Sequence, residues 1–300
     1  MDNKRRNIIR SLALTPFILG TRSLMASPKI TAITKNRLQY SVNAYSFNAL
    51  LSGGEMTFFE MMEFAASIGL DSVDLTGYYF SSYPDPPMNS ELFRLKRKAL
   101  ELGLNIPWTG IRNDFVNPDA NSRKVDRDRI RKWLEVSSTL GATIMRVFTG
   151  KHEYDGFSKN EVKEWLVEEY KICAKYGEEI GVIVGLQNHN EFLFTSDEIS
   201  DIITRVDSEW FGLILDVGSL HGENPYDEIE KLAPYATYWF VKEHIYPNGI
   251  KTPIYMKKIA KIIKNQGYQG YISFESLSDG DPKQIITSMF NSFKTEYKKL

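Results

Sequence analysis

The 300-residue sequence has one cysteine, Cys173, and only four histidines. A single cysteine excludes a disulfide within the chain, and without a CxxC pair or a Cys/His cluster there is no zinc site of the finger type. Lysine and arginine together number 37 against 38 aspartates and glutamates, a formal net charge of −1. This balance provides no basic surface for nucleic acid. No apolar run of 18 residues follows the N-terminal segment, so we expect no membrane span once that segment is removed.

The composition is that of a soluble globular protein. Hydrophobic residues make up 42% of the chain, charged residues 25% and aromatic residues 13%. These fractions exclude a disordered tail and a collagen-like rod, and they supply enough apolar material for a sizeable core. The length alone does not decide between one large domain and two small ones.

The first 26 residues have the layout of an export signal. A basic start at residues 4–6 precedes a mildly apolar stretch at residues 11–20, and small residues follow. The paired arginines resemble the twin-arginine export motif, and the weak hydrophobicity suits that route. We therefore predict an export signal over 1–26, a linker over 27–37 and a folded domain over 38–300, with a periplasmic or extracellular destination. The alternative is a frayed amphipathic helix.

From residue 38 onward, short apolar runs alternate with longer amphipathic segments. The predicted strands are Tyr40–Phe47, Ser72–Thr76, Ile106–Ile111, Thr143–Phe148, Val182–Gln187, Gly212–Asp216, Tyr238–Val241 and Gly270–Glu275. The predicted helices are Thr57–Ile68, Ser90–Leu102, Asp126–Leu140, Lys159–Ile180, Ser196–Val206, Tyr226–Ala233, Pro253–Asn265 and Asp281–Lys298.

Eight strand-then-helix units indicate a parallel sheet covered by helices. An open doubly wound sheet usually carries a glycine-rich phosphate turn after its first strand, and no GxGxxG motif stands there. We therefore predict a closed (β/α)8 TIM barrel that forms a single α/β domain. In such a barrel, the active site is built from residues at the C-terminal ends of the strands.

Polar residues gather at those predicted strand ends. Any one of them has a structural explanation, such as an internal ion pair or a loop cap. Together they favour a pocket for a small, hydroxyl-rich ligand, and neighbouring aromatic residues suit the apolar faces of a sugar. The polar residues are Asn43, Tyr45, Asp74, Arg112, Asn113, Arg146, Gln187, His189, Asp216, Lys242, His244 and Glu275. The aromatic residues are Tyr45, Tyr78, Tyr79, Phe80, Phe115, Trp239 and Tyr246.

Seven segments, in family order, resemble the sugar phosphate isomerase/epimerase family, whose fold is the xylose isomerase-like TIM barrel. The resemblance covers nearly all of residues 38–280 and implies carbohydrate metabolism by a sugar isomerase or epimerase. The segments are Tyr40–Phe47 (YSVNAYSF), Leu70–Leu75 (LDSVDL), Gly141–Gly150 (GATIMRVFTG), Gly185–Asn190 (GLQNHN), Gly212–Ser219 (GLILDVGS), Trp239–Glu243 (WFVKE) and Gly270–Leu277 (GYISFESL).

The resemblance also implies a divalent metal, Mn²⁺ or Mg²⁺, held in that family by Glu, Asp, His and Glu at strand ends. Asp216 and Glu275 match the second and fourth ligands, whereas Gln187 and Phe240 stand at the first and third. Phenylalanine cannot coordinate a metal, and glutamine offers only a neutral carbonyl oxygen. A metal at Gln187, Asp216 and Glu275 would therefore bind more weakly, and the sequence leaves a metal-free site open.

Proton transfer next to a carbonyl requires a base and a second proton carrier. Glu275 is the predicted base. The second carrier is either His189, whose ordinary pKa suits the task, or Lys242, whose pKa burial beside Arg146 would lower. Alternatively, Lys242 with Arg146 and Arg112 binds a carboxylate or stabilises an enolate without a metal. The residues predicted to bind the substrate are Asn43, Tyr45, Asp74, Arg112, Arg146, Gln187 and His244.

Two functions remain open at this point. The first is an exported enzyme that isomerises or epimerises a sugar or keto-sugar, or eliminates from a 3-keto-glycoside as a lyase. The alternative is a metal-depleted sugar-binding barrel without turnover. Both imply a small sugar or glycoside as the partner, with no nucleic acid and no membrane after signal removal. An exported protein rarely meets phosphorylated sugars, so we expect a free sugar or glycoside. The oligomeric state, including a homo-oligomer, is left open.

Overall fold

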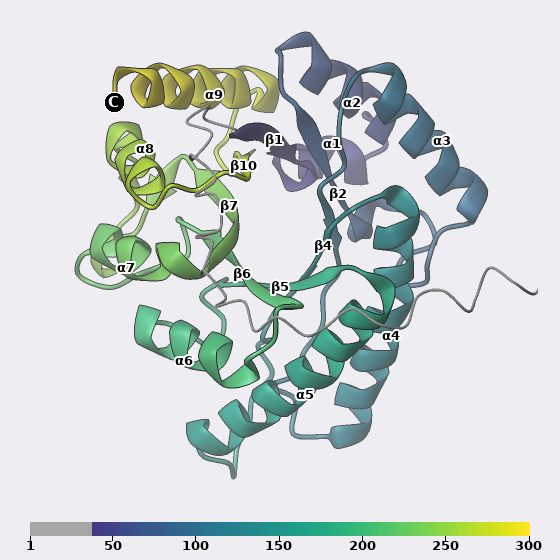
Figure 1. Cartoon of the computed structure of the whole chain (residues 1–300), viewed down its shortest axis with the longest axis vertical. Coiled ribbons are helices and arrows are strands. Elements are labelled where there is room, and N and C mark those ends of the chain that lie inside the picture. Colours follow the sequence, from purple (N-terminus) through teal and green to yellow (C-terminus); the bar gives the residue numbers. More distant parts are fainter. Residues whose placement is uncertain (1–37) are drawn as a thin grey trace, which may run out of the picture. The chain divides into compact units, whose positions relative to one another are not determined.

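The computed structural model describes residues 38–300. The predicted export signal over 1–26 and the linker over 27–37 lie outside the described residues and stay predictions. Eight parallel strands close into a barrel in the order β1-β10-β7-β6-β5-β4-β3-β2, and helices surround them (Figure 1). The predicted closed (β/α)8 barrel is therefore confirmed.

The eight barrel strands lie close to their predicted positions. An additional two-stranded antiparallel sheet of β8 (His244–Ile245) and β9 (Thr252–Pro253) follows the seventh barrel strand. The barrel strands are β1 (Gln39–Asn43), β2 (Ser72–Thr76), β3 (Trp108–Gly110), β4 (Ile144–Val147), β5 (Ile183–Gln187), β6 (Phe211–Asp216), β7 (Ala236–Lys242) and β10 (Tyr271–Glu275).

The helices also follow the predicted pattern, except that the short helix at Asn48–Ser52 was not predicted. Two boundaries also differ. The predicted first strand is too long, because the chain turns into a 3-10 helix at Ala44–Phe47 once the side chain of Asn43 accepts the amide of Tyr45. The fourth α-helix begins earlier than predicted, at Ala120, because Asp119 caps it. The helices are α1 (Asn48–Ser52), α2 (Phe58–Ser67), α3 (Asn89–Glu101), α4 (Ala120–Leu140), α5 (Lys159–Ile180), α6 (Ser196–Val206), α7 (Pro225–Leu232), α8 (Met256–Asn265) and α9 (Pro282–Lys299).

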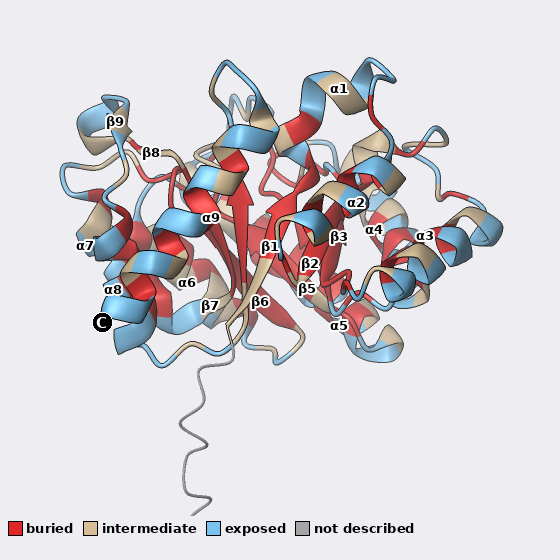
Figure 2. Cartoon of the chain, turned by 90° about the horizontal axis from the view of Figure 1, so that it is seen from above, coloured by how far each residue is buried: buried red, intermediate tan, exposed pale blue. Residues whose placement is uncertain are grey.

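Two hydrophobic clusters stabilise the fold. The larger one lies between the strands and the helices, where the strands and the inward faces of the helices are buried (Figure 2). The smaller one contains Trp108, Ile144, Ile214, Tyr238 and Phe240, which come from β3, β4, β6 and β7 and pack on one another. This second cluster lies inside the barrel, below the polar strand ends.

Register sets which polar residues are neighbours. Glu275 on β10 pairs with Lys242 on β7, and Asp216 on β6 pairs with Phe240 on β7. The C-terminal ends of β6, β7 and β10, which are far apart in the sequence, therefore lie side by side at one rim of the barrel. Within residues 38–300, no helix is long and apolar enough to cross a membrane.

Candidate active site

A cavity of about 200 Å³ opens at the C-terminal ends of the strands. Charged, amide and aromatic side chains together form its wall. The lining residues are Asn43, Tyr45, Thr76, Tyr78, Trp108, Arg112, Arg146, Phe148, Gln187, His189, Lys242, Glu275 and Leu277.

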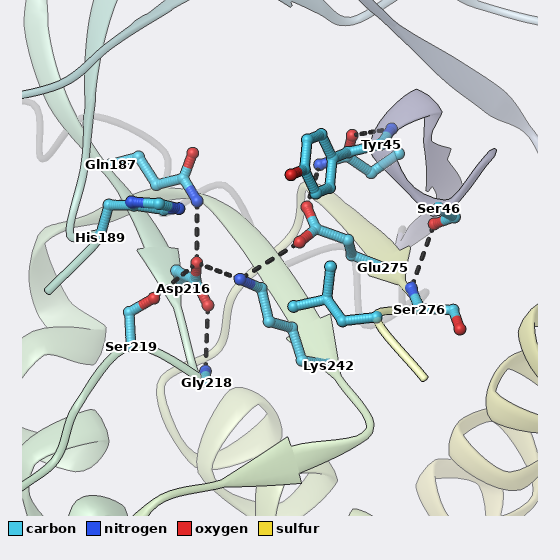
Figure 3. A network of polar contacts seen from close by, with 12 residues as sticks. Tyr45, Ser46, Gln187, His189, Asp216, Gly218, Ser219, Lys242, Glu275 and Ser276 are labelled. Atoms are coloured by element: carbon cyan, nitrogen blue, oxygen red, sulfur yellow. Dashed lines mark hydrogen bonds and ion pairs between the residues drawn. The ribbon is translucent and has the colours of Figure 1, made fainter. Parts of the chain in front are cut away.

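A buried ion triad forms one side of the site. The Nζ atom of Lys242 lies 2.8 Å from Oδ2 of Asp216 and 3.2 Å from Oε1 of Glu275, so the ammonium bridges the two carboxylates (Figure 3). All three side chains are at least nine-tenths buried. Burial acts to lower the pKa of Lys242, but the charges of Asp216 and Glu275 outweigh it and hold that pKa above its ordinary value. The prediction of a lowered lysine pKa is therefore wrong, and Lys242 stays an ammonium.

Asp216 lies behind Lys242, without exposed surface of its own. Its Oδ2 accepts hydrogen bonds from Nε2 of Gln187 at 2.8 Å and from Oγ of Ser219 at 2.9 Å. Burial acts to raise the pKa of Asp216, but the Lys242 ammonium outweighs this effect and the pKa lies below its ordinary value. Asp216 is therefore an anion that anchors Lys242 and Gln187.

The residues present do not fit the divalent metal that the family resemblance implies. A cation, the Lys242 ammonium, already lies between the two matching carboxylates, Asp216 and Glu275, and repels a second one. Gln187 directs its amide N–H at Asp216, and Phe240 packs on Trp108 with ring centroids 5.2 Å apart. In the part of the chain that the structure describes, no three His, Cys, Asp or Glu residues form a group suited to a metal. The expected ligand set of Gln187, Asp216 and Glu275 is corrected accordingly.

Arg146 also lines the cavity. Its Nη1 donates to Oε1 of Gln187 at 3.3 Å, and its Nη2 donates to the hydroxyl of Tyr78 at 2.6 Å. Its guanidinium carbon lies 4.0 Å from the ring centroid of Phe148. Gln187 thus connects Arg146 on one side with Asp216 on the other.

His189 reaches the cavity from the loop after β5. Its Nδ1 lies 3.2 Å from Oε1 of Glu191, and the same oxygen accepts Nη1 of Arg112 at 3.0 Å. Because a carboxylate accepts, we assign the proton to Nδ1, which leaves Nε2 as the basic nitrogen. Burial acts to raise the pKa of Glu191, but His189 and Arg112 outweigh it and lower that pKa. The sequence analysis missed Glu191, and its only signal was its position two residues after His189.

Two predicted substrate-binding residues lie outside the cavity wall. Asp74 is fully buried one layer lower, where Ser41 and Tyr238 donate to its carboxylate and burial raises its pKa to about 7. The strand continues past it, so Thr76, which lies two residues further on the same face, lines the cavity instead. His244 leaves the barrel with β8, and strand alternation no longer positions it.

The other predicted binding residues, Asn43, Tyr45, Arg112, Arg146 and Gln187, all line the cavity, as do Glu275, His189 and Lys242. Of the aromatic residues, Tyr45 and Tyr78 line it, whereas Phe80, Phe115 and Trp239 are buried in the core. Trp108 and Phe148 belong to the wall but were not predicted, because nothing in their sequence context separates them from core aromatics.

The family model of the xylose isomerase-like TIM barrel matches residues 62–295 of this chain. No curated protein matches its sequence. D-Psicose 3-epimerase from Clostridium cellulolyticum H10, crystallised with D-tagatose, is 17% identical with a TM-score of 0.66, covering 87% of this chain and 96% of that one.

Two further solved structures are similar over most of their length. 3-Keto-D-glucoside 4-epimerase from E. coli is 13% identical with a TM-score of 0.69, covering 86% of this chain and 99% of that one. The probable 3-DHS dehydratase AsbF from Bacillus anthracis is 17% identical with a TM-score of 0.65, covering 85% of this chain and 98% of that one. At these identities the likeness shows the fold alone.

Proposed function

This chain belongs to the xylose isomerase-like TIM barrel family, and from that premise we propose that it is an enzyme that moves a proton next to the carbonyl of a sugar or keto-sugar. The observation that carries the proposal is the Lys242 ammonium, held between Asp216 and Glu275 in the cavity wall. It places a fixed positive charge beside a carboxylate that can act as a base.

Lys242 supports this chemistry as an electrostatic group. Removing a proton next to a carbonyl creates an enediolate, and a cation near its oxygen lowers the barrier. An ammonium has three N–H donors, of which Asp216 and Glu275 each take one. The third donor is left for a substrate oxygen. Because Lys242 is already anchored on both sides, little reorganisation is needed when the negative charge develops.

Glu275 supports the proposal as the base. Its Oε1 lies beside Lys242, and its Oε2 accepts Nδ2 of Asn43 at 2.5 Å. A carboxylate oriented from two sides takes a proton from a carbon that the cavity holds against it. Negative charge then passes from Glu275 to the substrate oxygen while both stay close to the same ammonium.

His189 is the proposed second proton carrier. Its Nε2 is the basic nitrogen, and Glu191 orients the ring through Nδ1. Two proton carriers in one cavity are suited to isomerisation or epimerisation, since one removes a proton from the substrate and the other returns a proton to it. Elimination from a 3-keto-glycoside begins with the same proton abstraction, followed by loss of the leaving group. The amides of Asn43 and Gln187 suit the hydroxyl groups of a sugar.

The non-catalytic sugar-binding barrel stays as a second candidate. One observation favours it: Gln187 and Phe240 stand where the family resemblance implies a charged ligand and a histidine. In that case the Lys242 triad would be a structural ion cluster at the base of a binding pocket.

Solvent exchange distinguishes the two candidates. The protein is incubated with ketohexoses and 3-keto-glucosides in D2O with a chelator, and deuterium at the carbon next to the carbonyl is followed by NMR. We expect deuterium incorporation that depends on the protein, because proton abstraction exposes the carbanion to solvent whichever product forms. Ligands that bind, as shown by a raised melting temperature, but exchange no proton would contradict the enzyme proposal and support the binding barrel.

A further inference from the structure

The charge of Arg146 is not balanced by a neighbouring acid. Its side chain is almost fully buried, with 4% of its surface exposed. Within residues 38–300, no carboxylate lies within ion-pair distance of it, and its Nε has no hydrogen-bond partner. Its two acceptors, the amide oxygen of Gln187 and the hydroxyl of Tyr78, are neutral, since burial raises the pKa of Tyr78.

Most other buried acidic and basic side chains in residues 38–300 are in ion pairs, whereas Asp74 accepts hydrogen bonds from hydroxyl groups and has a pKa raised to about 7. Lys242 lies between two carboxylates, and buried Glu169 accepts from both Arg123 and Arg127. An unpaired buried charge is costly, which is why buried ions in proteins are normally paired. Arg146 therefore differs from Lys242, the other buried basic residue within residues 38–300, in having no carboxylate partner, and it lies in the wall of the cavity.

The residues around Arg146 hold its guanidinium group in a fixed position. Its carbon lies 4.0 Å from the ring centroid of Phe148 and 5.4 Å from that of Trp108. Gly110 pairs with it across β3 and β4, and a Cβ there would come within 2.7 Å of the Nε of Arg146. Aromatic faces and a glycine thus hold the cation in place without neutralising it.

A second guanidinium lies beside the same rings. The carbon of Arg112 is 4.9 Å from the ring centroid of Phe148 and 6.0 Å from that of Tyr78, both of which also contact Arg146. Glu191 pairs with Arg112 and with His189, and within residues 38–300 no ion pair joins it to Arg146. With His189 in the neutral form assigned above, two guanidinium groups against one carboxylate leave this end of the cavity with one positive charge in excess.

We propose that Arg146, with Arg112 beside it, binds a carboxylate group of the ligand, which makes the substrate a sugar acid. Each terminal nitrogen of Arg146 has two N–H groups and uses one of them, so two donors remain. A single excess charge matches a carboxylate, whereas a phosphate has about −1.5 to −2 at pH 7 and would crowd Glu275 with surplus negative charge.

The substrate class rests on the proposed function, but the carboxylate site itself does not. In the sugar acid, the carboxylate lies at the Arg146 end and the reacting carbonyl at the Lys242 and Glu275 end. Gln187 spans the two ends, because it accepts from Arg146 and donates to Asp216.

Calorimetric titration of the full chain with matched ligand pairs tests the site. The ligands are D-glucuronate, D-galacturonate and D-mannuronate, each beside its methyl ester, which keeps the shape and removes the charge. Glucose 6-phosphate is included for comparison. We expect at least one acid to bind about tenfold or more tightly than its ester, as a hydrogen bond to a charged group provides. If no acid binds more tightly than its ester, or if the phosphate binds more tightly than every acid, the proposal is overturned.

Variants assign the preference to Arg146. Arg146→Gln is expected to remove the difference between acid and ester, and Gly110→Ala is expected to reduce it by displacing the guanidinium. Arg131→Gln, on the exposed face of α4 where the arginine contacts Glu179 and Tyr176, serves as the matched control and should leave the difference unchanged. A preference that survives in folded Arg146→Gln overturns the assignment. If that variant does not fold, the comparison of acid and ester on the unaltered protein decides.

The two proposals fail separately. Preference for the acid without deuterium exchange on any sugar acid or keto-sugar would reject the enzyme proposal and leave the carboxylate site standing. Exchange on neutral keto-sugars without any preference for an acid would reject the carboxylate site and leave the enzyme proposal standing.

Discussion

Replacing Lys242 with methionine is expected to lower the free energy of unfolding by about 3–5 kcal/mol at pH 7. The ammonium is buried between Asp216 and Glu275, so its removal leaves two carboxylates close together without a counter-charge. Urea denaturation of both proteins at pH 7 measures the difference. Lys257→Met, at an exposed lysine on α8, is the matched control and should change stability by no more than about 0.5 kcal/mol.

The pH dependence of this loss follows from the directions of the two pKa shifts. The pKa of Asp216 is lowered in the folded protein, so its stabilisation is present above its ordinary value of 3.8 and is lost as pH falls through the folded pKa. The pKa of Lys242 is raised, so its stabilisation is present below 10.5 and is lost as pH rises through the folded pKa. The difference between wild type and Lys242→Met should thus be largest near neutrality and shrink in acid. Equal stability of the two proteins at pH 7 would contradict the buried triad.

Replacing Glu275 with glutamine is expected to slow deuterium exchange and turnover by about 10²–10⁴-fold, the range that a general base contributes. The amide keeps the size of the carboxylate, and its oxygen can still accept from Lys242 or from Asn43. Ligand affinity should therefore change far less than the rate. Rates of exchange and dissociation constants for the same ligand measure the two effects separately.

A matched control for this variant is Glu209→Gln, which changes an exposed glutamate in the loop before β6. It should leave both the exchange rate and the affinity unchanged. Full exchange activity in Glu275→Gln would remove Glu275 from the role of base, and it would direct attention to His189 as the group that takes the proton.

Much of the site could be predicted because strands impose a simple geometry. Side chains alternate along a strand, and the ends of parallel strands meet at one rim, so Gln187, Asp216, Lys242 and Glu275 were expected to converge. The structure brings them together. The positions of strand ends in the sequence carry this information without any knowledge of the loops.

Depth and charge could not be predicted in the same way. Asp74 lies one layer below the cavity because Thr76, two residues further along β2, is the residue at the strand end. The bounds of this strand were predicted correctly, but the charged residue within it was taken for the one at its end. The direction in which the pKa of Lys242 shifts depends on which charged groups lie closest to its Nζ. In the structure these are the carboxylates of Asp216 and Glu275 rather than Arg146. Similarly, the start of α4 before Asp126 depends on the cap at Asp119, because its first turns are polar and show no apolar period.

Crystals grown with Mn²⁺ and measured for anomalous scattering test the central claim, that the Lys242 ammonium occupies the position between Asp216 and Glu275. We predict electron density for the lysine Nζ between the two carboxylates and no anomalous peak there. A manganese peak bonded to Asp216 and Glu275, with the Lys242 side chain displaced, would contradict the claim and restore the metal site that the family resemblance implies.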